Sequence, residues 1–254
     1  MRLKAIKFKM IKNINFLHFE SLPSTNQKLY QLSENNCPSW TVISTDNQST
    51  GRGYANNSWL SEPYKNSTFS FLIHHSLDVE KDLFYFNMWV ATEITNYLTK
   101  WQLNAQVKWP NDIILNGKKL GGILIESKIM GYKTKFTVVG LGINLNQRKF
   151  GELQHATSVV NESAHEKLDV FEFTKELMLH LYSNYHKIEN KSFTDILKNY
   201  NQNLFRRNQI SVFELDNKKI NGVIMRVTEQ GKLIINLEGM GEKVFGFKEI
   251  KLLY

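Results

Sequence analysis

Cysteine is almost absent from this sequence, because Cys37 is the single cysteine among 254 residues. One thiol cannot form a disulfide within the chain, and this usage is typical of a reducing compartment. Long apolar runs are also missing: no stretch approaches the ~18 consecutive apolar residues of a membrane span. The basic residues 1–10 lack the apolar run and cleavage site of a signal peptide. We therefore expect a cytoplasmic protein without a membrane segment.

Several common motifs of phosphate and metal sites are missing as well. The P-loop pattern G-x-x-x-x-G-K-[ST] fails, because Asp112 stands at the first glycine position and Lys119 at the Ser/Thr position. The dinucleotide pattern G-x-G-x-x-G fails at Gly51 and at Gly140, since neither segment has the third glycine followed by a helix. The seven histidines show no H-E-x-x-H spacing, and no G-x-S-x-G elbow occurs. We therefore expect no protein-bound catalytic metal.

The residues that are present suit a globular domain with a basic surface. Apolar residues make up 42% of the chain, and sixteen Phe with five Trp can fill a large core. The net charge is +8 and the pI is about 9.3, with Lys and Arg scattered along the chain. This charge suits nucleic acid, a nucleotide substrate or an acidic protein partner, and it also suits a simple solvated surface. Composition leaves these four interpretations open.

Hydrophobic periodicity predicts an α+β main body with a central mixed or antiparallel sheet and flanking helices. Ser24 is the expected N-cap of the first helix, with Gln27 as its capping-box partner. Asn116-Gly117 predicts a type I′ hairpin turn. Strands are expected at 16–19, 40–45, 67–75 and three or four times between 105 and 146, with helices after residue 24 and at 81–101, 171–188 and 193–203.

The last fifty residues show a different pattern, with short strands separated by turn residues from residue 209 onward. This pattern predicts a small C-terminal β-barrel. The expected division is an N-terminal extension at 1–15, a main domain at 16–204 and the barrel domain at 205–254.

Three polar segments stand out between the expected strands. The first is a loop within residues 45–69, in which two glycines flank Arg52; loops of this length are usually functional or disordered. The second is residues 108–112, Lys-Trp-Pro-Asn-Asp, where Pro110 prevents ladder pairing and presents the amide and carboxylate at a bend. The third is residues 118–122, where Gly121-Gly122 indicates a bulge or a close approach of backbone or ligand. Each has an ordinary explanation as a turn or a solvated hairpin, but together they suit an anionic, phosphate-bearing ligand.

The order of these segments resembles that of biotin–protein ligases. The similarity covers roughly residues 16–254. It does not include the N-terminal winged helix of the bifunctional repressor members, so the resemblance implies the monofunctional type. It also implies a class II synthetase-like biotinyl/lipoyl ligase fold with an SH3-like C-terminal barrel. The segments that carry the resemblance are Ser24-Thr25-Asn26, Gln48, Gly51-Arg52-Gly53, Trp59, residues 108–112, residues 119–123 and residues 140–146.

The resemblance implies an ATP-dependent ligase that uses biotin and ATP with Mg²⁺. The enzyme would form biotinyl-5′-AMP and transfer biotin to a lysine of a biotin carboxyl carrier domain, as in acetyl-CoA carboxylase or a related biotin-dependent enzyme. DNA and membranes are not expected partners. A mixed anhydride hydrolyses in water, so the loop around Arg52 is expected to close over it as a lid.

Roles for individual residues follow from the same resemblance. Catalytic roles are implied for Lys119, Arg52 and Lys108, which supply positive charge at phosphorus, and for Asp112, which orients or deprotonates the incoming lysine. Nucleotide binding is implied for Trp59, Asn111 and Asn144. Biotin binding is implied for Ser24, Thr25, Asn26, Gln48, Arg52, Gly53, Tyr54, Lys119, Gly121 and Gly122.

The loop departs from the family pattern after Gly53. Tyr54, Ala55 and Asn56 stand where the family commonly has two polar or basic residues and a third glycine, which predicts a stiffer, less cationic lid. Three alternatives remain: a lipoate–protein ligase-like adenylating enzyme, a basic nucleic-acid-binding protein and a catalytically silent biotin binder. The C-terminal region lacks the clustered aromatic residues of a single-strand binding platform, which disfavours the second.

Overall fold

The computed structural model describes residues 7–54, 57–79 and 82–254. Ala55 and Asn56, which were expected to stiffen the lid, lie outside these ranges. The chain forms two compact units, each made of two segments: residues 1–79 with 118–182, and residues 80–117 with 183–254. This spatial grouping does not test where a separately folding domain begins, so the domain boundaries at 16 and 205 stay predictions.

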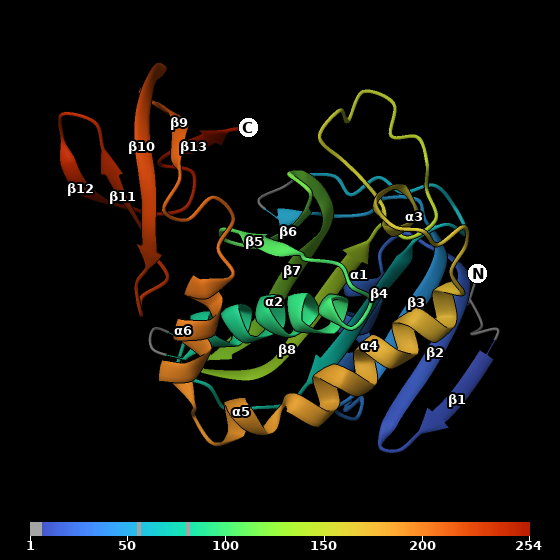
Figure 1. Cartoon of the computed structure of the whole chain (residues 1–254). Coiled ribbons are helices and arrows are strands. Elements are labelled where there is room, and N and C mark those ends of the chain that lie inside the picture. Colours follow the sequence, from blue (N-terminus) through green and yellow to red (C-terminus); the bar gives the residue numbers. More distant parts are fainter. Residues whose placement is uncertain (1–6, 55–56, 80–81) are drawn as a thin grey trace. The chain divides into compact units, whose positions relative to one another are not determined.

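The first unit is a mixed sheet with helices on both faces (Figure 1). β2 and β3 pair in parallel, and the other neighbouring strands of this unit pair antiparallel. The expected α+β class with a mixed sheet is therefore confirmed. In spatial order the strands are β1 (Lys7–Ile11), β2 (Ile14–Leu22), β3 (Thr41–Gln48), β4 (Ser67–Ile73), β8 (Lys133–Ile143) and β7 (Lys118–Met130).

Two of these strands correct the sequence analysis. β1 was not predicted as a strand, because the first strand was expected at residues 16–19, and it pairs with β2 at the edge of the sheet. Charged residues alternate with apolar ones in its sequence, which is usual for an edge strand that must not aggregate. β3 continues to Gln48, so the polar loop is shorter than expected and spans residues 49–66.

Helix α1 (Thr25–Ser33) covers one face of this sheet, and α4 (Val170–Asn184) covers the other (Figure 1). Leu29 of α1 is fully buried in an apolar cluster with side chains of β2, β3, β4 and β8. On the opposite face, Phe171 of α4 packs edge-on against Phe16. Ser24 caps α1 as predicted, because its Oγ accepts a hydrogen bond from the Gln27 N–H at 3.4 Å.

The second unit contains the long helix α2, two further helices and two groups of strands. Its helices are α2 (Leu83–Thr99), α5 (His186–Glu189) and α6 (Phe193–Gln202), and α2 packs against the other two. The helix predicted at 171–188 is therefore interrupted near Tyr185, between α4 and α5. A short α3 (Val159–Glu162), in the first unit, was not predicted.

The strands of the second unit are all antiparallel. The five C-terminal strands form an antiparallel sheet in the order β12-β11-β10-β9-β13, which is consistent with the expected SH3-like domain, although the described strands do not form a closed barrel. The strand bounds are β5 (Gln106–Lys108), β6 (Asp112–Leu115), β9 (Ile210–Leu215), β10 (Lys218–Val227), β11 (Leu233–Leu237), β12 (Gly241–Phe245) and β13 (Lys251–Leu253).

Predicted turn residues have the backbone conformations that the turns require. Asn116 and Gly117 have φ of 50° and 78°, which confirms the type I′ geometry. Asp216 and Asn217, between β9 and β10, also have positive φ. Among the described residues, no helix is both long and apolar enough to span a membrane.

Candidate active site

Glycines occupy several neighbouring positions on the sheet face that α1 covers, so this part of the face carries no side chains. Gly122 of β7 pairs with Gly142 of β8, and Gly140 lies two residues earlier on the same face. A Cβ at Gly140 would lie 2.8 Å from Cγ of Asn26, and a Cβ at Gly142 would lie 2.5 Å from Cζ2 of Trp59. Only glycine therefore permits the close approach of these two side chains to the sheet.

The start of α1 presents a connected group of polar side chains. The backbone N–H and the hydroxyl of Thr25 donate to Oε1 of Gln48 at 2.8 and 3.1 Å. Ser70 Oγ on β4 lies 2.7 Å from Thr25 Oγ1 and also bonds Oδ1 of Asn26. Ser24, Thr25 and Asn26 are each at most 3% exposed. Their orientations are fixed before any ligand binds, as preorganised recognition requires.

Glu126 links this group to the polar loop. Nδ2 of Asn26 donates to Oε2 of Glu126 at 2.9 Å, and Nη2 of Arg52 donates to the same oxygen at 3.0 Å. Glu126 follows Gly122 by four residues on β7 and therefore lies on the same face of the strand. Arg52 is about half exposed, with a side-chain relative accessibility of 47%. One carboxylate thus holds a loop cation beside α1.

The polar loop has more local structure than its composition indicated. Arg52 and Ser58 form an isolated antiparallel bridge, and the Gly53 N–H donates to the Asn57 carbonyl at 2.7 Å. The Trp59 N–H donates to the Gly51 carbonyl at 2.9 Å. The described part of the loop is therefore a small turn closed by backbone hydrogen bonds, with Tyr54 exposed at its tip.

Trp59 lies against the glycine-lined part of the sheet, next to Gly142. Its Nε1 atom is buried and has no hydrogen-bond partner within the described ranges. An unsatisfied buried donor costs about 1–3 kcal/mol unless a ligand or water supplies an acceptor. The nucleotide-binding role implied for Trp59 stays a prediction.

Lys119 and Asn144 are tied to one segment that precedes α3. The backbone N–H of Lys119 donates to the His155 carbonyl at 2.6 Å, and its carbonyl accepts from the Thr157 N–H at 2.9 Å. Nδ2 of Asn144 donates to the Thr157 carbonyl at 2.9 Å. Next to them, a Cβ at Gly121 would lie 2.6 Å from the Gly142 carbonyl, so Gly121 marks a close backbone approach and not a bulge.

Lys108, Asn111 and Asp112 belong to the second unit, in the turn between β5 and β6. Lys108 pairs with Asp112 across this hairpin. The Lys108 ammonium lies 4.6 Å from the ring centroid of Tyr254, a cation–π distance. Burial, followed by the nearby Asp112 charge, raises the pKa of Tyr254 to about 12.

The intervening residues of this turn are also held by the second unit. Nε1 of Trp109 donates to the Gly231 carbonyl at 2.9 Å. The Pro110 carbonyl accepts from the Tyr200 hydroxyl at 3.0 Å and from Nδ2 of Asn87 at 3.1 Å. The turn is therefore supported by α2, α6 and the β10–β11 connection.

The structure thus divides the predicted site residues between the two units. The biotin-binding set, with Trp59, Lys119 and Asn144, lies in the first unit, and Lys108, Asn111 and Asp112 lie in the second. The sequence analysis did not identify Ser70 or Glu126 as site residues. It also did not predict that Gly140 leaves room for the Asn26 side chain. Alternating glycines at 140 and 142 were the available signal, because residues two apart in a strand share a face.

Polar side chains meet at the start of α1, over a part of the sheet occupied by glycines and beside a loop that carries Arg52. Convergent polar groups of this kind are typical of proteins that bind a small ligand. A family model described as the Biotin/lipoate A/B protein ligase family matches residues 18–144. The chain belongs to this family.

Similar proteins and structures carry related descriptions. The chain is 26% identical over 185 residues to the bifunctional ligase/repressor BirA of Bacillus subtilis, covering 72% of this chain and 57% of that protein. The chain thus matches little more than half the length of this relative. It is 51% identical over 39 residues to the biotin--[acetyl-CoA-carboxylase] ligase of Paracoccus denitrificans, covering 15% of this chain and 16% of that one. It also resembles the structure of the Aquifex aeolicus biotin protein ligase in complex with biotin and ATP, with a TM-score of 0.75, 25% identity and coverage of 94% and 98%.

Proposed function

We propose that this protein is an ATP-dependent ligase that activates biotin as biotinyl-5′-AMP and transfers it to a lysine of a biotin carboxyl carrier domain. The observation that carries the proposal is the connected group at the start of α1. There Thr25, Asn26, Gln48 and Arg52 are joined through Ser70 and Glu126, over a sheet face cleared by glycines. The family membership and the likeness to a ligase structure with biotin and ATP support the same conclusion.

The polar group and the glycine-lined face suit a small bicyclic acid. Ser24, Thr25, Asn26 and Gln48 offer donors and acceptors for a ureido ring, while Gly121 and Gly122 let the ligand approach the backbone closely. Gly53 and Tyr54 close the site from the loop side. Trp59 offers a buried N–H, and Asn111 and Asn144 offer amide groups for a nucleotide. Each of these assignments is a proposal for mutagenesis.

The reaction would proceed in two transfers. In the first, a biotin carboxylate oxygen bonds to the α-phosphorus of MgATP, and the bond from that phosphorus to the bridging oxygen breaks to release pyrophosphate. In the second, the lysine nitrogen bonds to the acyl carbon, AMP leaves, and the nitrogen loses a proton. Arg52, Lys108 and Lys119 would stabilise the negative charge at phosphorus. Asp112 would orient the incoming amine or accept its proton.

The direct test is incubation of the chain with biotin, MgATP and a purified carrier domain, followed by mass measurement of the carrier. One added biotinyl group on a single lysine is expected. Lipoate in place of biotin should give no modification, and modification by lipoate alone would favour the lipoate ligase alternative. Pyrophosphate should be released with biotin and MgATP even without the carrier. A chain that binds biotin but releases no pyrophosphate would be a silent binder.

Lys119→Ala tests whether the Lys119 ammonium group contributes to adenylate formation. Removing one preorganised cation should slow adenylate formation by about 10²–10³-fold, as for other donors to a developing oxyanion. The backbone hydrogen bonds of residue 119 are retained in this variant, so its unfolding midpoint should match the parent. Pyrophosphate release at the parent rate would remove Lys119 from the proposed role.

A further inference from the structure

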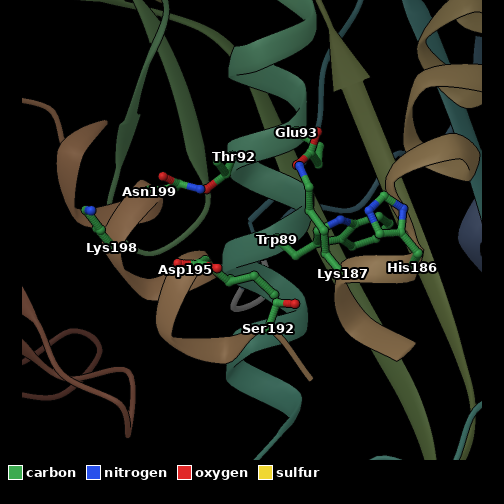
Figure 2. Close-up of a pocket in the computed structure, with 10 residues that line it drawn as sticks. Trp89, Thr92, Glu93, His186, Lys187, Ser192, Asp195, Lys198 and Asn199 are labelled. Carbon is green, nitrogen blue, oxygen red and sulfur yellow. The ribbon is translucent and has the colours of Figure 1, made fainter. Parts of the chain in front are cut away.

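The turn that carries Lys108 rests on helices that are held firmly together within the second unit. In Figure 2 the side chains of Glu93 on α2 and Lys187 on α5 point toward each other. The Lys187 ammonium donates to Oε1 of Glu93 at 2.7 Å, and the Glu93 side chain is only 3% exposed. Breaking such a pair would leave a buried charge uncompensated, so α2 keeps one position against α5. The same helix carries Asn87, whose Nδ2 bonds the Pro110 carbonyl, so the turn has a fixed base.

Tyr254 supports the same turn from the side of the C-terminal sheet. It follows directly after β13, which pairs with β9. Its ring packs edge-on against the ring of Phe205, with centroids 5.3 Å apart, and Phe205 is 6% exposed. The Phe205 N–H donates to the carbonyl of Val107 at 2.9 Å, and Val107 directly precedes Lys108 on β5. The Tyr254 ring is therefore fixed relative to the backbone that carries Lys108.

The face of this ring holds the Lys108 ammonium. Nζ of Lys108 lies 4.6 Å from the ring centroid, well inside the ~6 Å limit of cation–π attraction. Burial, followed by the charge of Asp112, raises the pKa of Tyr254 to about 12, so its hydroxyl stays neutral near pH 7. The ring thus attracts the ammonium through its quadrupole and adds no negative charge of its own. Glu126 differs in this respect, because its carboxylate holds Arg52 by an opposite charge.

We propose that Tyr254 is a positioning residue, whose ring holds the Lys108 ammonium where it stabilises negative charge at phosphorus during adenylate formation. A lysine side chain has several rotatable bonds, and a cation that is already ordered stabilises a transition state more than one that must first be ordered. The inference rests on the proposed ligase function, in which Lys108 supplies this charge. Because the charge develops in the transition state, loss of positioning should lower the maximal rate of adenylate formation and leave the half-saturating MgATP concentration unchanged.

The test replaces Tyr254 in the full chain by phenylalanine and by phenylalanines with an increasing number of ring fluorines. Fluorine weakens the negative face of the ring and changes its shape little, so packing against Phe205 should be kept. Tyr254→Phe should form adenylate within about twofold of the parent rate, because the ring face is retained. Across the fluorinated series the maximal rate should fall stepwise, by about tenfold in all, at an unchanged unfolding temperature. The readout is single-turnover pyrophosphate release with biotin and MgATP.

Lys108→Met gives the matched background for this series. Without the Lys108 ammonium, fluorination should no longer change the rate, and all members of the series should be equally slow. Equal rates across the series in the presence of Lys108, while the parent releases pyrophosphate, would overturn the proposal. A Tyr254→Phe variant as slow as the most fluorinated one would also overturn it, because that result would assign the effect to the hydroxyl.

Acylation of Lys108 tests the contact without enzyme activity. Only the neutral amine attacks an amine-reactive ester, whereas the ring stabilises the charged ammonium. The rate of Lys108 acylation at a fixed pH, measured by peptide mass, should therefore rise with each added fluorine. An unchanged rate would show that the ring does not hold the ammonium and would overturn the proposal. A parent that releases no pyrophosphate would instead overturn the proposed ligase function, and the acylation series would still report the contact.

Discussion

Gly140→Ala is the sharpest test of how the sheet and α1 build the proposed biotin site. A Cβ at residue 140 would overlap the Asn26 side chain, lying 2.8 Å from its Cγ and 3.1 Å from its Nδ2. Asn26 is 3% exposed, so its amide has no nearby solvent into which it can move. The added methyl must therefore displace the amide or push α1 from the sheet.

The expected cost follows from the hydrogen bonds that Asn26 would lose. Its Nδ2 donates to the Glu126 carboxylate and to the Leu124 carbonyl, and its Oδ1 accepts from the Ser70 hydroxyl. A neutral hydrogen bond contributes about 1 kcal/mol and one to a charged group about 1.5–3 kcal/mol. Since neighbouring groups adjust in part, we expect Gly140→Ala to reduce the free energy of unfolding by about 3 kcal/mol.

Urea denaturation measures this loss, and calorimetry measures the accompanying loss of biotin affinity. The control is the double variant Gly140→Ala with Asn26→Ala, because removing the amide makes room for the new methyl. The double variant should be no less stable than Asn26→Ala alone, which gives a coupling energy of about 2–3 kcal/mol. Additive losses, or a Gly140→Ala change within about 0.5 kcal/mol of zero, would refute the close approach.

Three further perturbations test other contacts. Glu126→Ala removes the hydrogen bond from the buried Asn26 amide as well as the partly exposed Arg52 ion pair, so it should reduce the free energy of unfolding by about 1.5–3 kcal/mol. It should also increase protease cleavage near Arg52, and unchanged cleavage would show that the carboxylate does not hold the loop. Burial, with a second histidine adding to the effect, lowers the pKa of His75 from 6.5 to about 4. The unfolded chain therefore binds a proton that the folded chain does not between these values, so the free energy of unfolding should fall by about 3 kcal/mol as pH drops from about 6.5 to 4. His75→Gln should flatten this slope in denaturation curves recorded across the range, and an unchanged slope would assign it to other groups. Gly142→Ala must displace the Trp59 ring, so tryptophan emission should shift to the red relative to the parent; an unshifted spectrum would contradict the packing.

Local signals predicted the parts of the fold that depend on a few consecutive residues. The Ser24 cap and the Asn116-Gly117 turn were predictable because each follows from side chains within four residues of one another. The interruption near Tyr185 was not, because the apolar spacing of residues 171–188 continues through it. A pattern that fits one long helix does not show where tertiary packing interrupts it.

The candidate site was only partly predictable for a different reason. Resemblance pointed to Asn26 and Arg52, but the carboxylate that joins them, Glu126, is 100 and 74 residues away in sequence. Its role depends on the register between β7 and β8, which places Gly140 opposite Leu124. Register is set by the whole sheet, so a single sequence shows that a strand exists without showing which side chains meet across it.

The turn that carries Lys108 has a consequence for biosynthesis. Three of its supports come from residues translated much later: the Tyr200 hydroxyl, the Gly231 carbonyl and the ring of Tyr254. A growing polypeptide on the ribosome therefore elongates by about 90 residues after Trp109 before the first of these three partners, Tyr200, is added. Chains cut short by a premature stop soon after residue 200 would keep the polar group at the start of α1 and lack the Gly231 and Tyr254 supports of this turn. Under the proposed function, such products should bind biotin far better than they transfer it.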